Sequence, residues 1–172
     1  MHAPQLRTDA TLRAVFWNHV ALHRFSVEEA LFVLMALLGN CGLQLQGHGF
    51  VIAQYPTECA TWLTHHLRHR STEAGVPPWP FAEDEEPVAE DATLESFMAL
   101  QTVLADMTTE LGLGLFSAIR ALLALLAEVL GMVQQARDWD EEAMAAVLEA
   151  VGWSVARYMA NAALVSLPLP PC

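Results

Sequence analysis

Apolar residues recur every three or four positions through most of this chain, the spacing that places them on one face of an α-helix. Clusters of glycine, proline and polar residues separate these stretches. In the segment "FSVEEA", Ser26 followed by Glu29 forms a capping box, a pattern typical of a helix start. The pattern predicts helices over residues 9–24, 27–38, 56–70, 93–111, 115–133 and 140–165.

Two segments interrupt the helical pattern. Residues 43–54 alternate Leu with Gln and then continue through Gly-His-Gly into "FVIAQ", which favours a short β-hairpin. Residues 71–92 combine several prolines with a run of acidic residues and are typical of a loop or linker. We therefore expect an all-α protein, a single compact bundle of five or six helices over residues 1–172. Its N-terminal helices lie in 1–70 and its C-terminal helices in 93–172, and no internal repeat is evident.

The most apolar stretch, residues 115–133, contains only two charged residues, Arg120 and Glu128. Each charge at the centre of a bilayer costs about 2.5–3.5 kcal/mol, which weakens the case for a membrane span. The apolar run at residues 30–38 is too short to cross a bilayer. We expect 115–133 to be a buried helix or a surface that pairs with another helix, through a seam of mostly small residues: Gly114, Ser117, Ala121, Ala124, Glu128 and Gly131. Membrane insertion is the alternative.

Composition narrows the class of partner. Of the 172 residues, 54% are apolar and 16% charged, and the net charge is −12. This acidic balance disfavours nucleic acid and anionic membrane surfaces, because both attract clustered Lys and Arg. The three cysteines, Cys41, Cys59 and Cys172, are widely spaced and include no CxxC motif. No apolar signal segment is visible near residue 1, so we expect a reducing, cytoplasmic setting.

The histidines give the only pattern that resembles a metal site. His19 and His23 are four residues apart, as are His65 and His69, so each pair could chelate one metal from a helix face, with Glu58 as a further ligand. Zinc, copper, iron or haem would suit such ligands. The pair at 65 and 69 lies on the polar face of its helix, which favours a solvated surface. The expected state therefore has no cofactor, and metal or haem binding is the alternative.

Catalytic motifs of the GxSxG, Walker A and GxGxxG types do not occur in the sequence. Trp79 lies between prolines in the acidic segment, where a tryptophan is expected to dock on the domain or on a partner. We therefore expect a non-enzymatic protein–protein interaction module, such as an adaptor, accessory subunit, chaperone or inhibitor, that binds through apolar helix faces. A homodimer is the expected assembly. A membrane-associated helical regulator is the remaining alternative.

Overall fold

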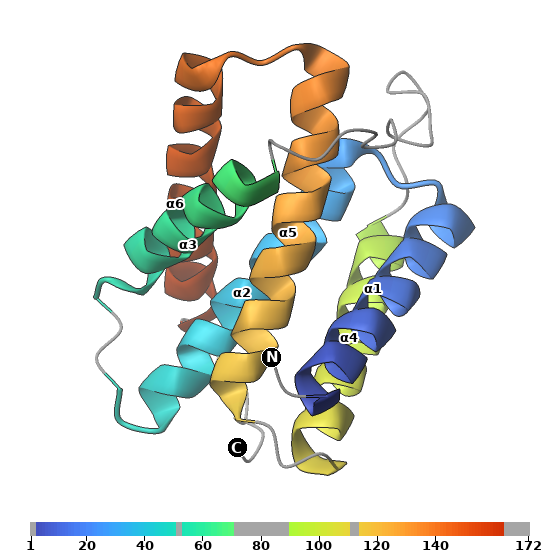
Figure 1. The fold of residues 1–172 in the computed structure, drawn as a ribbon. Helices are drawn as coiled ribbons and strands as arrows, with labels where there is room; N and C mark the ends of the chain where they lie inside the picture. Colours follow the sequence, from blue (N-terminus) through green and yellow to red (C-terminus); the bar gives the residue numbers. More distant parts are fainter. Residues whose placement is uncertain (1–2, 51–52, 71–89, 111–113, 164–172) are drawn as a thin grey trace.

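In the part that it describes, the computed structural model of the chain contains six helices and no strand (Figure 1). The described residues are 3–50, 53–70, 90–110 and 114–163. The helices are α1 (Ala3–His23), α2 (Val27–Gly47), α3 (Tyr55–Arg70), α4 (Glu90–Glu110), α5 (Leu115–Arg137) and α6 (Glu141–Ala163). The predicted all-α bundle is confirmed.

Helix α2 begins where the capping box predicts and continues further than expected. The Ser26 hydroxyl accepts a hydrogen bond from the Glu29 backbone N–H, which satisfies a donor of the first turn. The helix does not end at Gly39 but runs to Gly47, so the predicted β-hairpin over 43–54 is wrong. A glycine inside a helix costs about 1 kcal/mol relative to alanine. Here the buried helix face outweighs that cost, since Gly39, Gly42 and Leu45 all lie in the interior.

Most other helix boundaries lie close to the predicted ones, but α1 begins at Ala3, six residues before the expected start at residue 9. Helix α4 begins at Glu90, three residues before the expected cap Thr93, so the end of the predicted acidic loop belongs to a helix. Helix α5 begins after Gly114 and ends at Arg137, where the left-handed backbone of the following cap residue Asp138 (φ 52°) terminates the helix. Residues 71–89 lie outside the described part of the chain.

Helices α2 and α5 run antiparallel through the middle of the bundle (Figure 1). Helices α1 and α4 cover one side of this central pair, and α3 and α6 cover the other. The core is aliphatic with a few aromatic rings, and its largest fully buried side chains are Phe16, Phe25, Leu12, Leu34, Leu37, Leu38, Leu63, Leu100, Leu122, Leu126, Leu130 and Val20. Burial of these large apolar side chains stabilises the bundle through the hydrophobic effect.

The two halves of the chain pack on each other in equivalent ways. Helix α1 contacts α5 as α4 contacts α2, and α3 contacts α5 as α6 contacts α2. The two helices of each matched pair also contact one another: α1 contacts α4, α2 contacts α5, and α3 contacts α6. Among the described residues, every extensive helix–helix contact except that of α4 with α5 joins one half to the other. The fold is therefore an approximate two-fold arrangement of two interlocked three-helix units.

A matching repeat in the two central helices becomes visible once the structure supplies the register. With a shift of 88 residues, "ALFVLMALLGN" at 30–40 aligns with "AIRALLALLAE" at 118–128, and five of the eleven positions are identical. The interior residues coincide as well, for example Leu34 with Leu122 and Leu38 with Leu126, each fully buried. The sequence expectation that no repeat exists is corrected by this alignment. A repeat of leucine and alanine is easily hidden, because those residues dominate many buried helices.

Two glycines of α2 allow the neighbouring helices to approach closely. A Cβ atom at Gly39 would collide with the Tyr158 ring of α6. A Cβ at Gly42 would lie 2.6 Å from Cε1 of Tyr55 and 2.8 Å from Cε of Met159. Both residues lie beyond the helix end predicted at residue 38. Their physical role is to leave room for two tyrosine rings at the centre of the α2–α3–α6 layer.

Helices α2 and α5 are long and apolar enough to cross a membrane by length and composition alone. The 21 residues of α2 replace the short apolar run expected at 30–38, so the length argument against a span at that position no longer holds. Most residues of both helices are buried within the bundle, as in the core helices of a folded domain. Length and composition are therefore weak support for membrane insertion.

Candidate functional site

The predicted small-residue seam of α5 is divided by the fold. Ala121 and Glu128 are buried among the chain's own helices. Gly114 is exposed at the helix start, and a Cβ built at Gly114 or at Gly131 meets no other described residue within 4 Å outside the local helix backbone. Ser117 and Ala124 are partly buried. The seam therefore does not form one continuous exposed surface, and its tightest part already packs inside this chain.

Glu128 owes its buried position to an ion pair with α1. The Arg13 guanidinium donates from Nε to Glu128 Oε2 (2.8 Å) and from Nη2 to Oε1 (2.7 Å). This hydrogen-bonded pairing raises the pKa of Arg13 above its ordinary value. The two charged residues of the stretch 115–133 therefore have different surroundings, because Arg120 is exposed.

The two predicted histidine pairs lie on opposite sides of the bundle. His19 and His23 belong to α1, and His19 Nδ1 is 2.9 Å from Oγ of the buried Ser96 on α4. His23 Nε2 lies 3.9 Å from Glu95 Oε2. His65 belongs to α3, which lies on the other side of the central pair from α1 (Figure 1), and the side chain of His69 is outside the described part. The structure therefore does not bring the two pairs together into one four-histidine site.

Within the described residues, no group of three His, Cys, Asp or Glu side chains is close enough to hold a metal ion. Glu58 lies at a pocket rim on the outer part of α3, and His65 packs near the Trp62 and His66 rings. Trp79 falls outside the described residues, so its expected docking stays a prediction.

The best-formed candidate site is an apolar pocket of about 280 Å³ at one end of the bundle. It lies where the end of α2, the start of α3 and the start of α5 meet. Its inner walls are buried side chains and its rim carries exposed aromatic rings. The lining residues are Leu45, Phe50, Tyr55, Glu58, Cys59, Trp62, Phe116, Ile119, Arg120 and Leu123.

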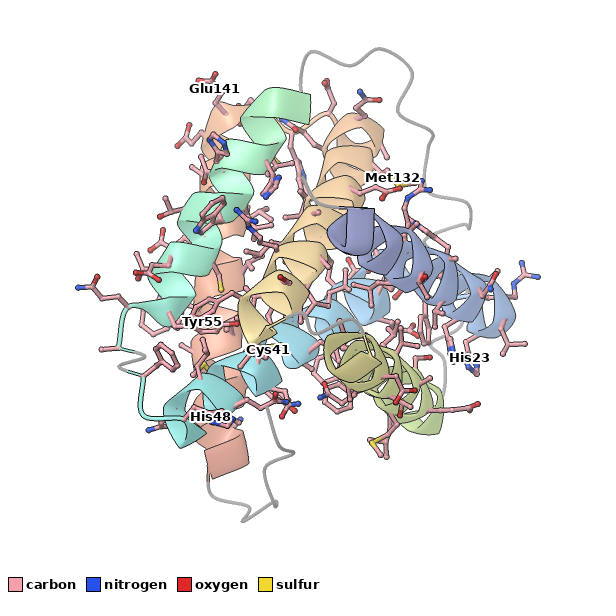
Figure 2. The ribbon with its side chains drawn as sticks, turned by 60° about the horizontal axis from the view of Figure 1, so that its bottom comes forward. His23, Cys41, His48, Tyr55, Met132 and Glu141 are labelled. Carbon is pink, nitrogen blue, oxygen red and sulfur yellow. The ribbon has the colours of Figure 1, made fainter. Side chains whose placement is uncertain are left out.

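Tyr55 fixes the inner wall of this aromatic pocket. Its ring lies against Gly42, and its hydroxyl donates a 2.6 Å hydrogen bond to the Leu38 carbonyl of α2. Figure 2 shows Tyr55 and Cys41 beside each other at the α2–α3 contact. Burial raises the pKa of Tyr55 far above its ordinary range, and the nearby thiols add to that effect. The phenol therefore remains a neutral donor, suited to a structural role.

Cys59, beside Tyr55, is a buried thiol. Burial raises the pKa of Cys59 to about 11, and the hydrogen bond with Tyr55 opposes that rise only in part. A thiol with such a pKa is protonated at neutral pH and is a weak nucleophile. The inner part of the pocket therefore provides an apolar wall and no activated nucleophile.

Three aromatic side chains at the rim are exposed although each has a large apolar surface. Phe50 is 51% exposed, Trp62 45% and Phe116 58%. Phe50 and Phe116 meet edge to face with ring centroids 5.6 Å apart, which links the α2–α3 connection to the start of α5. Glu58 and Arg120 add one charge of each sign to the rim.

The other half of the fold lacks this aromatic rim at the matched positions. With the shift of 88 residues, Phe116 corresponds to Glu28, Trp62 to Ala150 and Phe50 to Asp138. Glu28 instead receives a 3.0 Å hydrogen bond from the Arg137 guanidinium, which also lies 5.5 Å from the centroid of the Trp139 ring. One end of the interlocked units is thus joined by an ion pair, and the other presents aromatic side chains to solvent.

A second pocket of about 350 Å³ lies between α3, α5 and α6, at the opposite end of α3. It is lined by Thr64, Leu67, Gln134, Glu141, Met144, Ala145 and Leu148 and has no aromatic ring. The aromatic pocket is the better candidate because exposed aromatic side chains contribute most to protein recognition.

The sequence expectations did not identify the aromatic rim. One signal was available: Trp62 lies off the inward row formed by Cys59, Leu63 and Leu67, so the helical pattern placed it outside the core. Phe50 and Phe116 could not be joined to Trp62 without the fold, since the three come from separate segments. No protein-family model matches this chain, and comparisons with curated proteins and with solved structures found no significant similarity.

Proposed function

We propose that this protein is a non-enzymatic interaction module that binds a segment of a partner protein in the aromatic pocket. The observation that carries the proposal is the cluster of Phe50, Trp62 and Phe116, exposed around a pocket with buried apolar walls. Apolar patches that remain exposed on a folded protein commonly mark binding surfaces. The site replaces the α5 seam as the proposed docking surface.

The pocket has the composition of a recognition site. A Trp or Phe side chain buries about 150–250 Å² when fully covered, so three partly exposed rings offer a substantial apolar contact. At about 25 cal/mol per Å², covering even half of that area supplies several kcal/mol before the costs of association. Glu58 and Arg120 at the rim are suited to orienting a partner rather than to tight binding.

The proposed partner is a protein, which includes a second copy of this chain as a homodimer. The net charge of −12 disfavours nucleic acid. The proposal needs no cofactor and is compatible with a cytoplasmic protein. The buried thiol and phenol at the inner wall favour binding over chemistry, because neither is activated.

Site-specific photo-crosslinking tests this proposal. A benzophenone amino acid is placed at position 116 and, as a control, at position 153 on α6, where the native Trp is 72% exposed and does not line the pocket. We expect position 116 to yield a discrete crosslinked product that position 153 does not yield. A product of twice the 18.9 kDa chain mass would identify a second copy as the partner. Equal products, or none, from the two positions would contradict the proposal.

A further inference from the structure

We infer that residues 164–172, which follow α6, bind in the aromatic pocket of their own chain. This inference rests on the proposed docking function and names an occupant for the site. The bound segment would compete with any partner, so the module would carry its own inhibitor. The argument uses the place where α6 ends, the chemistry of the segment and the size of the pocket.

Helix α6 ends beside the pocket. Met159, one turn before the last residue Ala163, packs against α2 at Gly42, where the Tyr55 ring also lies. Tyr55 is part of the pocket wall. Nine residues in a polyproline II conformation extend about 28 Å, at 3.1 Å each. Because Met159 and the wall residue Tyr55 meet at Gly42, a segment of this length that starts after Ala163 can reach the pocket wall.

The segment has the chemistry of a ligand for an aromatic site. Its sequence, "LVSLPLPPC", contains no charged residue and alternates leucine with proline. Proline-rich segments bind aromatic-lined grooves because their extended conformation is already ordered before binding. An uncharged segment also avoids repulsion by a chain with a net charge of −12.

The pocket has the size for side-chain anchors. Its volume of about 280 Å³ lies just below the range of about 300–1,000 Å³ typical of small-molecule sites. Such a volume suits a few leucine or proline side chains of a peptide. Attachment to the same chain gives the segment an effective concentration of the order of millimolar, so even weak intrinsic affinity fills the site.

Fluorescence of a label on Cys172 tests the inference in the full chain. Cys41 and Cys59 are each only 2% exposed, so a bimane maleimide reacts with Cys172 in the native protein. Bimane emission is quenched by a nearby tryptophan. We expect Trp62→Phe, which keeps an aromatic rim but removes the quencher, to raise the emission at least about twofold. Phe116→Asp, which disrupts the rim, should raise it similarly, and Trp153→Phe should not.

Bimane emission that is unchanged in both Trp62→Phe and Phe116→Asp would overturn the inference. An excess of the unlabelled synthetic peptide of residues 164–172 should also raise emission by displacing the attached segment, and failure to do so would count against it. If unrelated peptides bind the pocket while the label stays insensitive, the inference fails and the proposed function stands. If no peptide binds the pocket and the label is also insensitive, both the inference and the proposed function fail.

Discussion

Arg13 and Glu128 are separated by 115 positions in sequence and form a bidentate ion pair between α1 and α5. The pair joins the two halves of the chain at the middle of the central helix. Its matched positions in the other half are Gln101 and Asn40, so each half carries polar residues there, but only one carries charges. The side chain of Arg13 is 61% exposed and that of Glu128 11%, which makes the carboxylate the costly partner to leave unpaired.

Removing Arg13 should therefore destabilise the fold more than removing both partners. We expect Arg13→Met to lower the free energy of unfolding by about 1–3 kcal/mol, the cost of a buried acceptor without its donor. The double variant Arg13→Met/Glu128→Leu should recover part of that loss. Urea unfolding of the two single variants and the double variant measures the coupling. Purely additive effects would show that the pair contributes little.

Glycine substitutions should separate close helix contacts from open helix surface. Gly39→Ala places a methyl group against the Tyr158 ring, and overpacking of this kind costs about 1–3 kcal/mol. The new methyl group of Gly131→Ala meets none of the described residues within 4 Å outside its own helix backbone, and the change should stabilise α5 by about 0.5–1 kcal/mol because alanine favours the helix. Thermal unfolding of the two variants side by side provides the comparison. Opposite signs are expected, and equal destabilisation would contradict the packing described for α5.

The interlocked halves should not fold separately. Residues 1–70 and 90–163 bury their helices mainly against each other, so each half alone lacks most of its core. We expect cleavage within residues 71–89 to leave two fragments that co-elute and unfold together. Each fragment isolated in denaturant and refolded alone should lose most helical circular dichroism, and mixing the two should restore it. A cooperative unfolding transition in either fragment alone would contradict the interlocked arrangement.

The sequence predicted helices well because their pattern is local. The Ser26–Glu29 capping box and the inward rows of the helices need only neighbouring residues to be recognised. The end of α2 was misplaced because Gly39 and Gly42 normally favour a helix stop. Their role depends on Tyr158 and Tyr55, which come from distant segments. The aromatic pocket escaped prediction for the same reason, since its rim combines residues from three parts of the chain.

The ion pair of Glu28 with Arg137 should give a small pH dependence to stability. The hydrogen bond from Arg137 lowers the pKa of Glu28 below its ordinary value of 4.5. Its stabilisation is therefore present above that value and is lost as the pH falls through the lower folded-state pKa. We expect Glu28→Gln to lower the melting temperature slightly at pH 7, and this difference to shrink as the pH falls below 4.5 and the native carboxylate becomes protonated. The exposed Glu149→Gln serves as the control. A difference that stays the same size as the pH falls would exclude the carboxylate as its source.

Peptide selection on the purified protein tests the central claim, that the aromatic pocket is a docking site for a protein segment. A random peptide library is selected on the full chain, and the recovered peptides are titrated against Trp62→Ala, Phe116→Ala and Trp153→Ala. The last variant removes an even more exposed aromatic ring that does not line the pocket. The account predicts peptides that share apolar anchor residues, whose Kd rises at least about tenfold in the first two variants and stays unchanged in the third. Peptides that bind all three variants equally well would contradict it.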